Sequence, residues 1–420
     1  MRVIYSILFY LALPWIFIRL WLKARKNPDY RKRWEERLGK VHHDIPQGVI
    51  WWHCVSVGET LASVPLINKF QQLHPNLPIL VTTMTPGGSL QVKNQFKETV
   101  FHQYVPYDLA GIMSGFIQRI QPKLCILMET EIWPNMVYYC HQKNIPVILA
   151  NARMSEKSAK KYAKFEQFTK QILPMITTIA VQNEVDGERF IQLGYPREQL
   201  QVTGSIKFDI QISSELIEKA NVLRQSFENH KSIWIAASTH QGEEEIILEA
   251  AKKIPNALLI LAPRHPDRRN EVLELCQKAN LKTAVRSKHE LPNQDDIRVF
   301  LVDTLGELLL FYAVSDIAFV GGSFISKGGH NLLEPAALGI PILSGESLYN
   351  FSEIEKILGS AQALIKVKNA DELSAQINDL FNHSAKREMM GKAGKEAIEK
   401  NKGATEKQLA LMEKLLRIEK

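Results

Sequence analysis

The sequence has few cysteines and no repeated or low-complexity segment. Its four cysteines are scattered over 420 residues, and none forms a CxxC or Cys/His pair with the spacing of zinc ligands. These absences argue against a disulfide-stapled scaffold and a zinc finger, and favour a reducing compartment. No period of about 20–50 residues recurs, which argues against solenoid and propeller architectures.

The remaining composition is typical of a globular protein with two domains. Hydrophobic residues make up 45% of the chain and charged residues 23%, which allows a sizeable core. A length of 420 residues suits two domains of ordinary size. The formal net charge of +7 fits an acidic partner such as a nucleotide, a phosphorylated lipid or a nucleic acid, without selecting one.

The first 22 residues differ from the rest of the chain. Residues 3–18 carry no charge, and with Arg19 snorkelling the apolar run reaches about 20 residues, enough to cross a bilayer core. No small-x-small cleavage site follows, so a signal peptide is disfavoured. We expect residues 1–22 to be an anchor that spans the membrane or lies in its interface; the alternative is a buried helix. Basic residues follow and place the downstream chain in the cytoplasm, next to anionic lipid: Lys23, Arg25, Lys26, Arg31, Lys32 and Arg33.

From about residue 48, short β-rich runs alternate with amphipathic helical segments. Such alternation predicts parallel sheets covered by helices on both faces. A charged helical stretch near residues 211–230 separates two sets of strands, so we predict two doubly wound α/β domains, 23–210 and 211–420. The last helical run, 403–419, is placed so that it could cross back to the first domain. The expected strands are 49–55, 79–84, 123–128, 146–150 and 176–181, then 232–237, 257–262, 298–302, 316–320 and 340–344.

Polar residues gather where the predicted strands end. Glu59 follows the first strand, and Glu129 and Glu131 follow the third. In the second set of strands, the polar turns 238–240 and 263–266 lie at the same kind of position. In doubly wound sheets, ligands bind at the carboxyl edge of the strands. The repetition predicts a cleft between two facing domains.

These turns lie in motifs that resemble a known family. The chain carries, in order, WWHCVSVGET, ETEIWPNM, NARMSEKS, VTGSIKFD, AASTHQGEEE, APRHPDR and GGSFISKGGHNLLEPAALGIPIL. They resemble motifs of the 3-deoxy-manno-octulosonate (Kdo) transferases of lipid A assembly, over about residues 30–355. The resemblance implies a GT-B fold of two Rossmann-like domains. It also implies a CMP-Kdo donor bound by the second domain, a lipid A precursor (lipid IVA) bound by the first, and the cytoplasmic face of the inner membrane.

Glu59 is the candidate general base. An inverting sugar transfer needs a group that takes the proton of the acceptor hydroxyl. Gly58 lets the backbone approach a substrate closely, and a carboxylate at a helix start is positioned by the amides there. The alternative interpretation is a helix-start carboxylate without a catalytic role.

Three further residues of the first domain are polar and lie at the same predicted edge. The resemblance suggests that a glutamate of the ETE motif, Glu129 or Glu131, and Lys207 stabilise the transition state. An interdomain ion pair is the alternative for these residues. Arg153 is a candidate contact for an acceptor phosphate.

The candidate donor site lies in the second domain. Arg264 sits between two prolines, and its guanidinium suits bidentate binding of the CMP phosphate; a surface salt bridge is the alternative. The loop 328–331 opens a helix and suits an anion, and Asn331 and Glu334 share one side of its first turn. Glu334 could accept hydrogen bonds from ribose hydroxyls, with a plain helix cap as the alternative. The resemblance adds Pro263, His265, Gly306, Glu307, Leu308, Leu332 and Leu333 as CMP contacts.

The chain contains no Asp-x-Asp pair, the motif with which metal-dependent sugar transferases hold a cation on a diphosphate. A CMP donor has one phosphate, so we expect neither a metal nor another cofactor. Glu129-x-Glu131 is the one feature that could hold a metal.

Two other functions compete with the transferase. A nucleotide-sugar epimerase would use the same scaffold but would have no use for an anchor. A basic RNA- or membrane-binding protein is disfavoured, because the basic residues do not interleave with aromatics in an RNA-recognition motif and the glutamates would repel phosphate backbones. We therefore expect no nucleic-acid partner.

Overall fold

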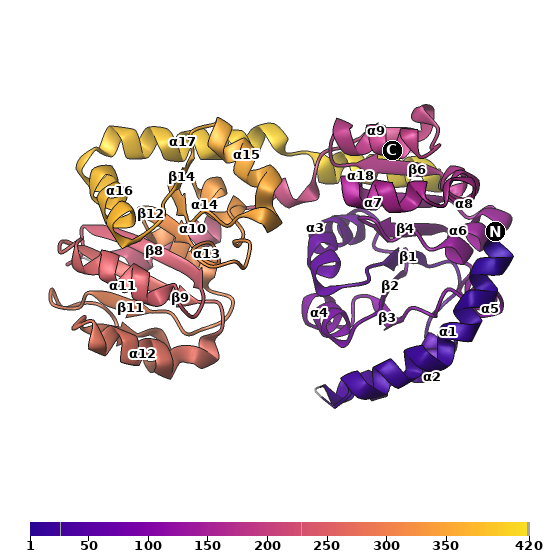
Figure 1. Cartoon of the computed structure of the whole chain (residues 1–420), viewed down its shortest axis with the longest axis horizontal. Helices are drawn as coiled ribbons and strands as arrows, with labels where there is room; N and C mark the ends of the chain where they lie inside the picture. The colour runs from indigo at the N-terminus through magenta and orange to yellow at the C-terminus, as the bar shows by residue number, and fades with distance from the viewer. Residues whose placement is uncertain (26, 228, 418–420) are drawn as a thin grey trace. The chain divides into compact units, whose positions relative to one another are not determined.

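The computed structural model describes residues 1–25, 27–227 and 229–417; Lys26 of the basic cluster and Glu419 of the last helical run lie outside these ranges. The chain forms two compact units, one of residues 1–209 with the chain from Lys402, the other of residues 210–401. The predicted boundary after residue 210 is one residue away. The last helix, α18 (Ala404–Leu416), packs in the first unit (Figure 1). The prediction that the last helical run crosses back is therefore confirmed, and the predicted range 211–420 extends too far.

The first unit is built on a seven-stranded sheet of order β3-β2-β1-β4-β5-β6-β7, in which every pair is parallel. From β3 to β6 this is the strand order of dinucleotide-binding folds, with the switch point between β1 and β4. The strands are β1 (Ile50–His53), β2 (Ile79–Thr83), β3 (Phe101–Tyr104), β4 (Leu124–Met128), β5 (Val147–Ala152), β6 (Thr178–Val181) and β7 (Leu200–Val202).

Helices cover both faces of this sheet. Trp51 of β1 packs into the core under one set of helices, whereas Ile50 and Trp52 pack into the core under the other set, because successive strand residues point to opposite faces. On the Trp51 side lie α5 (Ala110–Ile120), α6 (Pro134–Gln142), α8 (Glu166–Ile172) and α9 (Glu184–Gln192); on the other side lie α3 (Val57–Leu73), α4 (Pro86–Phe96) and α18; α2 (Trp34–Arg37) and α7 (Glu156–Ala163) complete the unit.

The C-terminal helix is an integral part of the first unit. Asp209 accepts hydrogen bonds from the backbone N–H of Gly403 at 2.7 Å and of Thr405 at 2.6 Å, which caps the start of α18. Gln408 is fully buried; its Oε1 accepts from the N–H of Asn151 at 3.0 Å and its Nε2 donates to Thr203 at 3.2 Å. The C-terminal helix α18 therefore stabilises the carboxyl edge of the first sheet.

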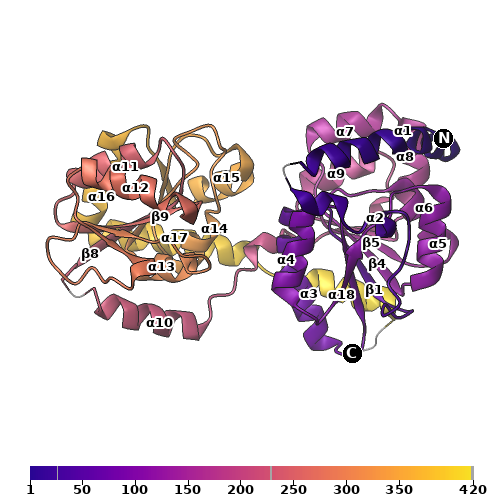
Figure 2. The same ribbon diagram turned by 90° about the horizontal axis from the view of Figure 1, so that it is seen from below.

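The second unit repeats the design with a parallel sheet of order β10-β11-β9-β8-β12-β13-β14. Figure 2 shows α10 and α13 on one side of this sheet and α11 and α12 on the other. The strands are β8 (Ser232–Thr239), β9 (Ala257–Pro263), β10 (Thr283–Val285), β11 (Val299–Leu301), β12 (Ile317–Val320), β13 (Ile342–Ser344) and β14 (Leu364–Lys366). The helices are α10 (Ser214–Gln225), α11 (Glu244–Lys252), α12 (Arg269–Lys278), α13 (Leu308–Val314), α14 (Leu333–Leu338), α15 (Ser352–Ser360), α16 (Ala370–Asn382) and α17 (Ser384–Asn401).

The N-terminal helix, α1 (Arg2–Lys23), lies on the surface of the first unit (Figure 1). Within the described residues it is the one helix long and apolar enough to cross a membrane, judged by length and composition. One side packs on Tyr107 and Leu109, and near the start of the helix Ser6 accepts from Asn135 at 3.1 Å. The other side exposes a row of large apolar residues, Val3, Ile4, Ile7, Leu8, Leu11, Trp15 and Ile18. An ordinary buried helix is therefore the wrong interpretation of this segment.

Candidate functional site

Glu59 lies in the first turn of α3, where the chain leaves the carboxyl end of β1. One carboxylate oxygen accepts from the Ser56 hydroxyl at 2.7 Å and the other from the Val55 backbone N–H at 2.7 Å. Ser56 in turn caps α3 by accepting from the N–H of Glu59 at 3.4 Å. This reciprocal arrangement is a form of capping box. Glu59 therefore stabilises the start of the helix, as the alternative interpretation expected, in addition to any role toward a substrate.

The surroundings of Glu59 favour its protonated form. Burial raises the pKa of its carboxyl to about 7; the charges of Glu131 and Glu129 also raise it, whereas the hydrogen bonds from Ser56 and Val55 oppose the shift. A carboxyl that titrates near neutrality is suited to accept a proton in a reaction and release it afterwards.

The ETE turn follows β4, the neighbour of β1 across the switch point. Glu129 has a left-handed φ of 56°, and its Oε1 lies 3.6 Å from the Nζ of Lys207. Glu131 accepts from the indole N–H of Trp133 at 3.0 Å. The first unit thus brings Glu59, both ETE glutamates and Lys207 together. The ion pair between Lys207 and Glu129 therefore lies within the first unit.

Asn151 is a supporting residue at this edge. It is fully buried with a left-handed φ of 50°, and its Oδ1 accepts from the N–H of Ile206 at 3.2 Å. Lys207 is the next residue, in the short 3-10 helix Ile206–Phe208. The side chain of Arg153 is exposed, and its carbonyl accepts from the Thr130 hydroxyl at 2.9 Å, which ties Arg153 to the ETE turn.

In the second unit, Glu243 joins the two strand ends at the centre of the sheet. It is fully buried at the start of α11. Its carboxylate accepts backbone N–H bonds from His240 at 3.0 Å, Gly322 at 2.7 Å, Ser323 at 2.9 Å and Phe324 at 2.9 Å. His240 follows β8 and the other three follow its neighbour β12. Sequence reasoning missed Glu243, although a carboxylate directly after a strand-end turn is a signal.

A second buried carboxylate holds the PRHPDR loop. Glu244 accepts from the Thr239 hydroxyl at 3.0 Å and from Arg268 at 2.7 Å. Burial raises the pKa of Glu244, and the ion pair with Arg268 counters this. Arg268 therefore fixes the loop, whereas the side chains of Arg264 and His265 are exposed at the same edge. In the described part of the chain, no ion pair involves Arg264, so the salt-bridge interpretation is wrong there.

The prediction that Asn331 and Glu334 share one side of the first helical turn is confirmed. Asn331 donates to Glu334 at 3.1 Å and accepts from the N–H of Leu333 at 3.1 Å. Burial raises the pKa of Glu334, and the bond from Asn331 lowers it. The side chains of Leu332 and Leu333 are buried in the core.

The turn 306–308 lies at the start of α13. Gly306 has a left-handed φ of 83°. Glu307 accepts from Arg286 at 2.7 Å and from the Thr304 hydroxyl at 2.5 Å, and the bond from Arg286 holds the pKa of its carboxyl below its usual range. This carboxylate is therefore already neutralised, and Leu308 is half-buried beside it.

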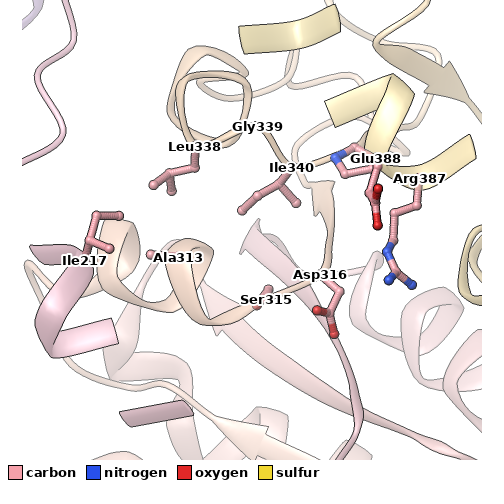
Figure 3. Close-up of a pocket in the computed structure, with 10 residues that line it drawn as sticks. Ile217, Ala313, Ser315, Asp316, Leu338, Gly339, Ile340, Arg387 and Glu388 are labelled. Carbon is pink, nitrogen blue, oxygen red and sulfur yellow. The ribbon is translucent and has the colours of Figure 1, made fainter. Parts of the chain in front are cut away.

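A cavity of 260 Å³ in the second unit is not part of this site. Its lining comes from α10, the turn before β12, the end of α14 and α17, and includes Ile217, Ser315, Asp316, Leu338 and Arg387 (Figure 3). It lies at the amino end of β12, opposite to the carboxyl edge that carries His240 and Gly322. No predicted site residue lines it.

Comparison with known proteins identifies the family. Residues 32–210 match the model of the 3-deoxy-D-manno-octulosonic-acid transferases (Kdo transferases), and residues 234–397 match the glycosyl transferases of group 1. The 3-deoxy-D-manno-octulosonic acid transferase of Haemophilus influenzae is 43% identical over 423 residues, 99% of each chain. The chain belongs to the Kdo transferase family. The Kdo transferase of Bordetella pertussis is 30% identical over 95% of this chain and 96% of its own. A probable mitochondrial one from Arabidopsis thaliana is 32% identical over 94% and 91%.

Solved structures of lower identity show the fold of this Kdo transferase family member. A glycosyltransferase from Rickettsia africae aligns with a TM-score of 0.57 at 12% identity, over 89% of this chain and 100% of its own. The UDP-GlcNAc 2-epimerase of Neisseria meningitidis aligns with a TM-score of 0.59 at 14% identity, over 88% and 100%. The predicted GT-B fold of two Rossmann-like units is confirmed.

Proposed function

We propose that the protein transfers Kdo from CMP-Kdo to a hydroxyl of a lipid A precursor, with inversion at the anomeric carbon. The observation that carries this proposal is Glu59, a carboxyl with a pKa of about 7 at the switch point of the first sheet, in a chain that belongs to the Kdo transferase family. The family supplies the reaction class, and the site supplies the group that the reaction needs.

In the proposed reaction, the ionised carboxylate of Glu59 takes the proton of the acceptor hydroxyl. The hydroxyl oxygen then forms a bond to the anomeric carbon, and the bond from that carbon to the phosphate oxygen breaks, so that CMP leaves with the electron pair. Ser56 and Val55 hold both carboxylate oxygens, which fixes their direction before the substrate arrives. General-base catalysis of this kind contributes roughly two to four decades in rate.

Lys207 and the ETE turn are the proposed electrostatic support. The ammonium of Lys207 lies 3.6 Å from Glu129 and remains 40% exposed, so it can face the negative charge of a Kdo carboxylate or of the departing phosphate. Arg153, exposed beside the same turn, is the proposed contact of an acceptor phosphate.

The second unit is the proposed donor site. Arg264 extends from a loop held by Arg268 and Glu244, and a guanidinium binds phosphate oxygens in a bidentate manner. Asn331 and Glu334 present an amide and a carboxyl for the cytidine and ribose groups. Because Glu307 is neutralised by Arg286, the turn 306–308 would contact CMP mainly through its backbone.

The reaction is proposed to need no metal ion. A monophosphate leaving group carries less charge than a diphosphate, and Arg264 and Lys207 are cations at the two sites. Activity should therefore survive EDTA; a complete loss that magnesium restores would contradict this.

Membrane attachment is proposed to occur through the exposed side of α1, at the cytoplasmic face of the inner membrane. One side of the helix is taken up by the first unit, which favours a helix that lies in the interface over one that spans the bilayer. Two of the basic residues that follow, Arg25 and Arg31, lie over the Trp21 ring at 5.2 Å, a combination that suits anionic headgroups.

The test is mass spectrometry of the product formed from CMP-Kdo and a defined lipid A precursor. The wild-type protein should add Kdo, whereas Glu59→Gln should lower turnover by roughly two to four decades while CMP affinity stays unchanged. An epimerase would instead convert a nucleotide sugar without any lipid. Near-normal turnover of Glu59→Gln removes the base assignment, and a Kdo-free product removes the whole proposal.

A further inference from the structure

Two imidazole rings meet at the carboxyl edge of the second sheet. His240 follows β8, and His330 lies in the glycine-rich loop before α14. Their Nε2 atoms are 2.8 Å apart, whereas the ring centroids are 5.0 Å apart with the planes at 14°. The rings are therefore joined edge to edge through these nitrogens. At this distance one Nε2 carries a hydrogen and donates it to the lone pair of the other, so the pair shares one proton at the contact.

The loops that carry both rings are fixed by backbone contacts. The backbone N–H of His240 donates to the buried Glu243 at 3.0 Å. A Cβ on Gly322 would lie 2.9 Å from Cδ2 of His330, so the glycine makes room for the ring, and the N–H of Gly329 donates to the Gly322 carbonyl at 2.8 Å. The strand-end loops thus bring the two imidazoles into contact, and the glycine at 322 leaves room for the His330 ring.

The charges around the pair are mainly positive. Burial lowers the pKa of His330 to about 4, and His240, Arg264 and His265 add to this effect. For His240, burial also lowers the pKa, Glu243 opposes the shift, and His265, Lys327 and Arg264 reinforce it. The carboxylate of Glu243 already accepts four backbone N–H bonds. Near neutral pH the unliganded pair is therefore neutral, in a field that attracts an anion.

We propose that the His240–His330 pair takes up one proton from solvent when the phosphate of the cytidine nucleotide binds beside Arg264. The inference rests on the proposed function, because it assumes the donor site of the second unit. A phosphate dianion next to the pair favours the charged imidazolium, and the hydrogen bond between the rings lets both share the added charge. The added proton binds the one ring nitrogen of the two histidines that carries neither a hydrogen nor the hydrogen bond between the rings. No other bond is made or broken. The resulting cation would offset the charge that develops on the departing phosphate.

The test is calorimetric titration of the detergent-solubilised full chain with CMP, in buffers of different ionisation enthalpy. The protein should take up a measurable fraction of one proton per bound CMP at about pH 7.5. At this pH the phosphate of CMP is already a dianion, because its second pKa is about 6. His330→Asn and His240→Asn should each bind CMP with little or no proton uptake. His289→Asn is the matched control, since His289 is exposed with a left-handed φ of 57° that Asn tolerates, and should keep the uptake.

The wild-type protein offers a second readout that needs no variant. Linked proton uptake requires CMP affinity to rise as the pH falls from about 8 to about 6.5, by about threefold to tenfold. CMP binding without proton uptake, or uptake that persists in both histidine variants, overturns the inference and leaves the donor site standing. A wild-type protein that does not bind CMP at all overturns the proposed donor together with the inference.

Discussion

The Nζ of Lys207 and the Oε1 of Glu129 lie 3.6 Å apart at the carboxyl edge of the first sheet. The ammonium compensates one carboxylate of the ETE turn, while Glu131 accepts from the indole N–H of Trp133. Among the described residues, the three carboxyl groups of this edge make one ion pair, that of Glu129 with Lys207. The excess of negative charge explains why Glu131 and Glu129 add to the effect of burial on the pKa of Glu59.

The pH dependence of the reaction should follow from this arrangement. Only ionised Glu59 can act as a base, so kcat/KM should rise with pH, with a midpoint at about 7, and level off above it. Glu131→Gln removes a negative charge and keeps an oxygen for Trp133, so it should move this midpoint down by about 0.5–1 pH unit. Glu166→Gln is the control, because Glu166 is exposed and paired with Lys170. A midpoint that stays fixed in Glu131→Gln would show that this charge does not act on the base.

The strands that were predicted from the sequence and those that were not differ in one respect, their position in the sheet. All ten predicted strands are present, and all ten are interior strands. The four that were missed, β3, β7, β10 and β14, are the edges of the two sheets. Interior parallel strands are buried on both faces and give continuous apolar runs. Edge strands such as β7 and β14 are partly exposed along their length, so their sequences lack that signal.

The candidate site also contains residues that could be predicted from the sequence and one whose role could not. Glu59 and the ETE glutamates were predictable, because each lies in a recognisable motif shortly after an apolar strand. The position of Glu243 after a strand-end turn was a signal, but its role was not predictable, because its partners Gly322 to Phe324 lie about 80 residues further along the chain. The shared cleft between the units stays a prediction.

Arg264 should contribute much of the affinity for the nucleotide. A hydrogen bond to a charged group contributes about 1.5–3 kcal/mol, so Arg264→Ala should weaken CMP binding about tenfold to 150-fold. The loop should keep its shape, because Arg268 and Glu244 hold it. Arg197→Ala is the control, since Arg197 pairs with Glu188 on the surface of the first unit. Calorimetric titration with CMP at low and high salt measures the affinities of both variants. If Arg264→Ala binds CMP as tightly as Arg197→Ala, the role of Arg264 is refuted.

Glu243 should be critical for the stability of the second unit. In Glu243→Gln, an NH2 group replaces one oxygen and faces backbone N–H donors, so up to two of the four N–H groups lose their acceptor. Each buried N–H without a partner costs about 1–3 kcal/mol, and the free energy of unfolding should fall by about 2–5 kcal/mol. Glu245→Gln is the matched control, because Glu245 is exposed on the same helix. Denaturant unfolding tests the change, and hydrogen exchange at Gly322 and Ser323 should rise in Glu243→Gln alone; equal stability would mean that other contacts hold these loops.

The two sides of α1 should have separable roles. From the sequence alone, removal of residues 1–22 is expected to spare chemistry on a solubilised acceptor and to weaken membrane association. The structure makes that deletion a poor test, because it would also uncover Tyr107 and Leu109 and leave Asn135 without Ser6. Point changes on the exposed side avoid this problem: Leu8 is 60% and Leu11 73% exposed, so changing them leaves the first unit covered.

Replacing Leu8 and Leu11 together by Ser should weaken binding to anionic vesicles at least about tenfold, because each buried Leu contributes about 1.5–3 kcal/mol. The unfolding midpoint and turnover on a detergent-dispersed acceptor should stay unchanged. Phe9→Ser, on the docked side next to Tyr107, should do the reverse and lower the unfolding midpoint while vesicle binding persists. Co-sedimentation with vesicles and thermal unfolding of both variants separate the two sides. If the Leu8/Leu11 variant still sediments fully with vesicles, the attachment must come from another surface, and the basic residues around Trp21 would be the first to examine.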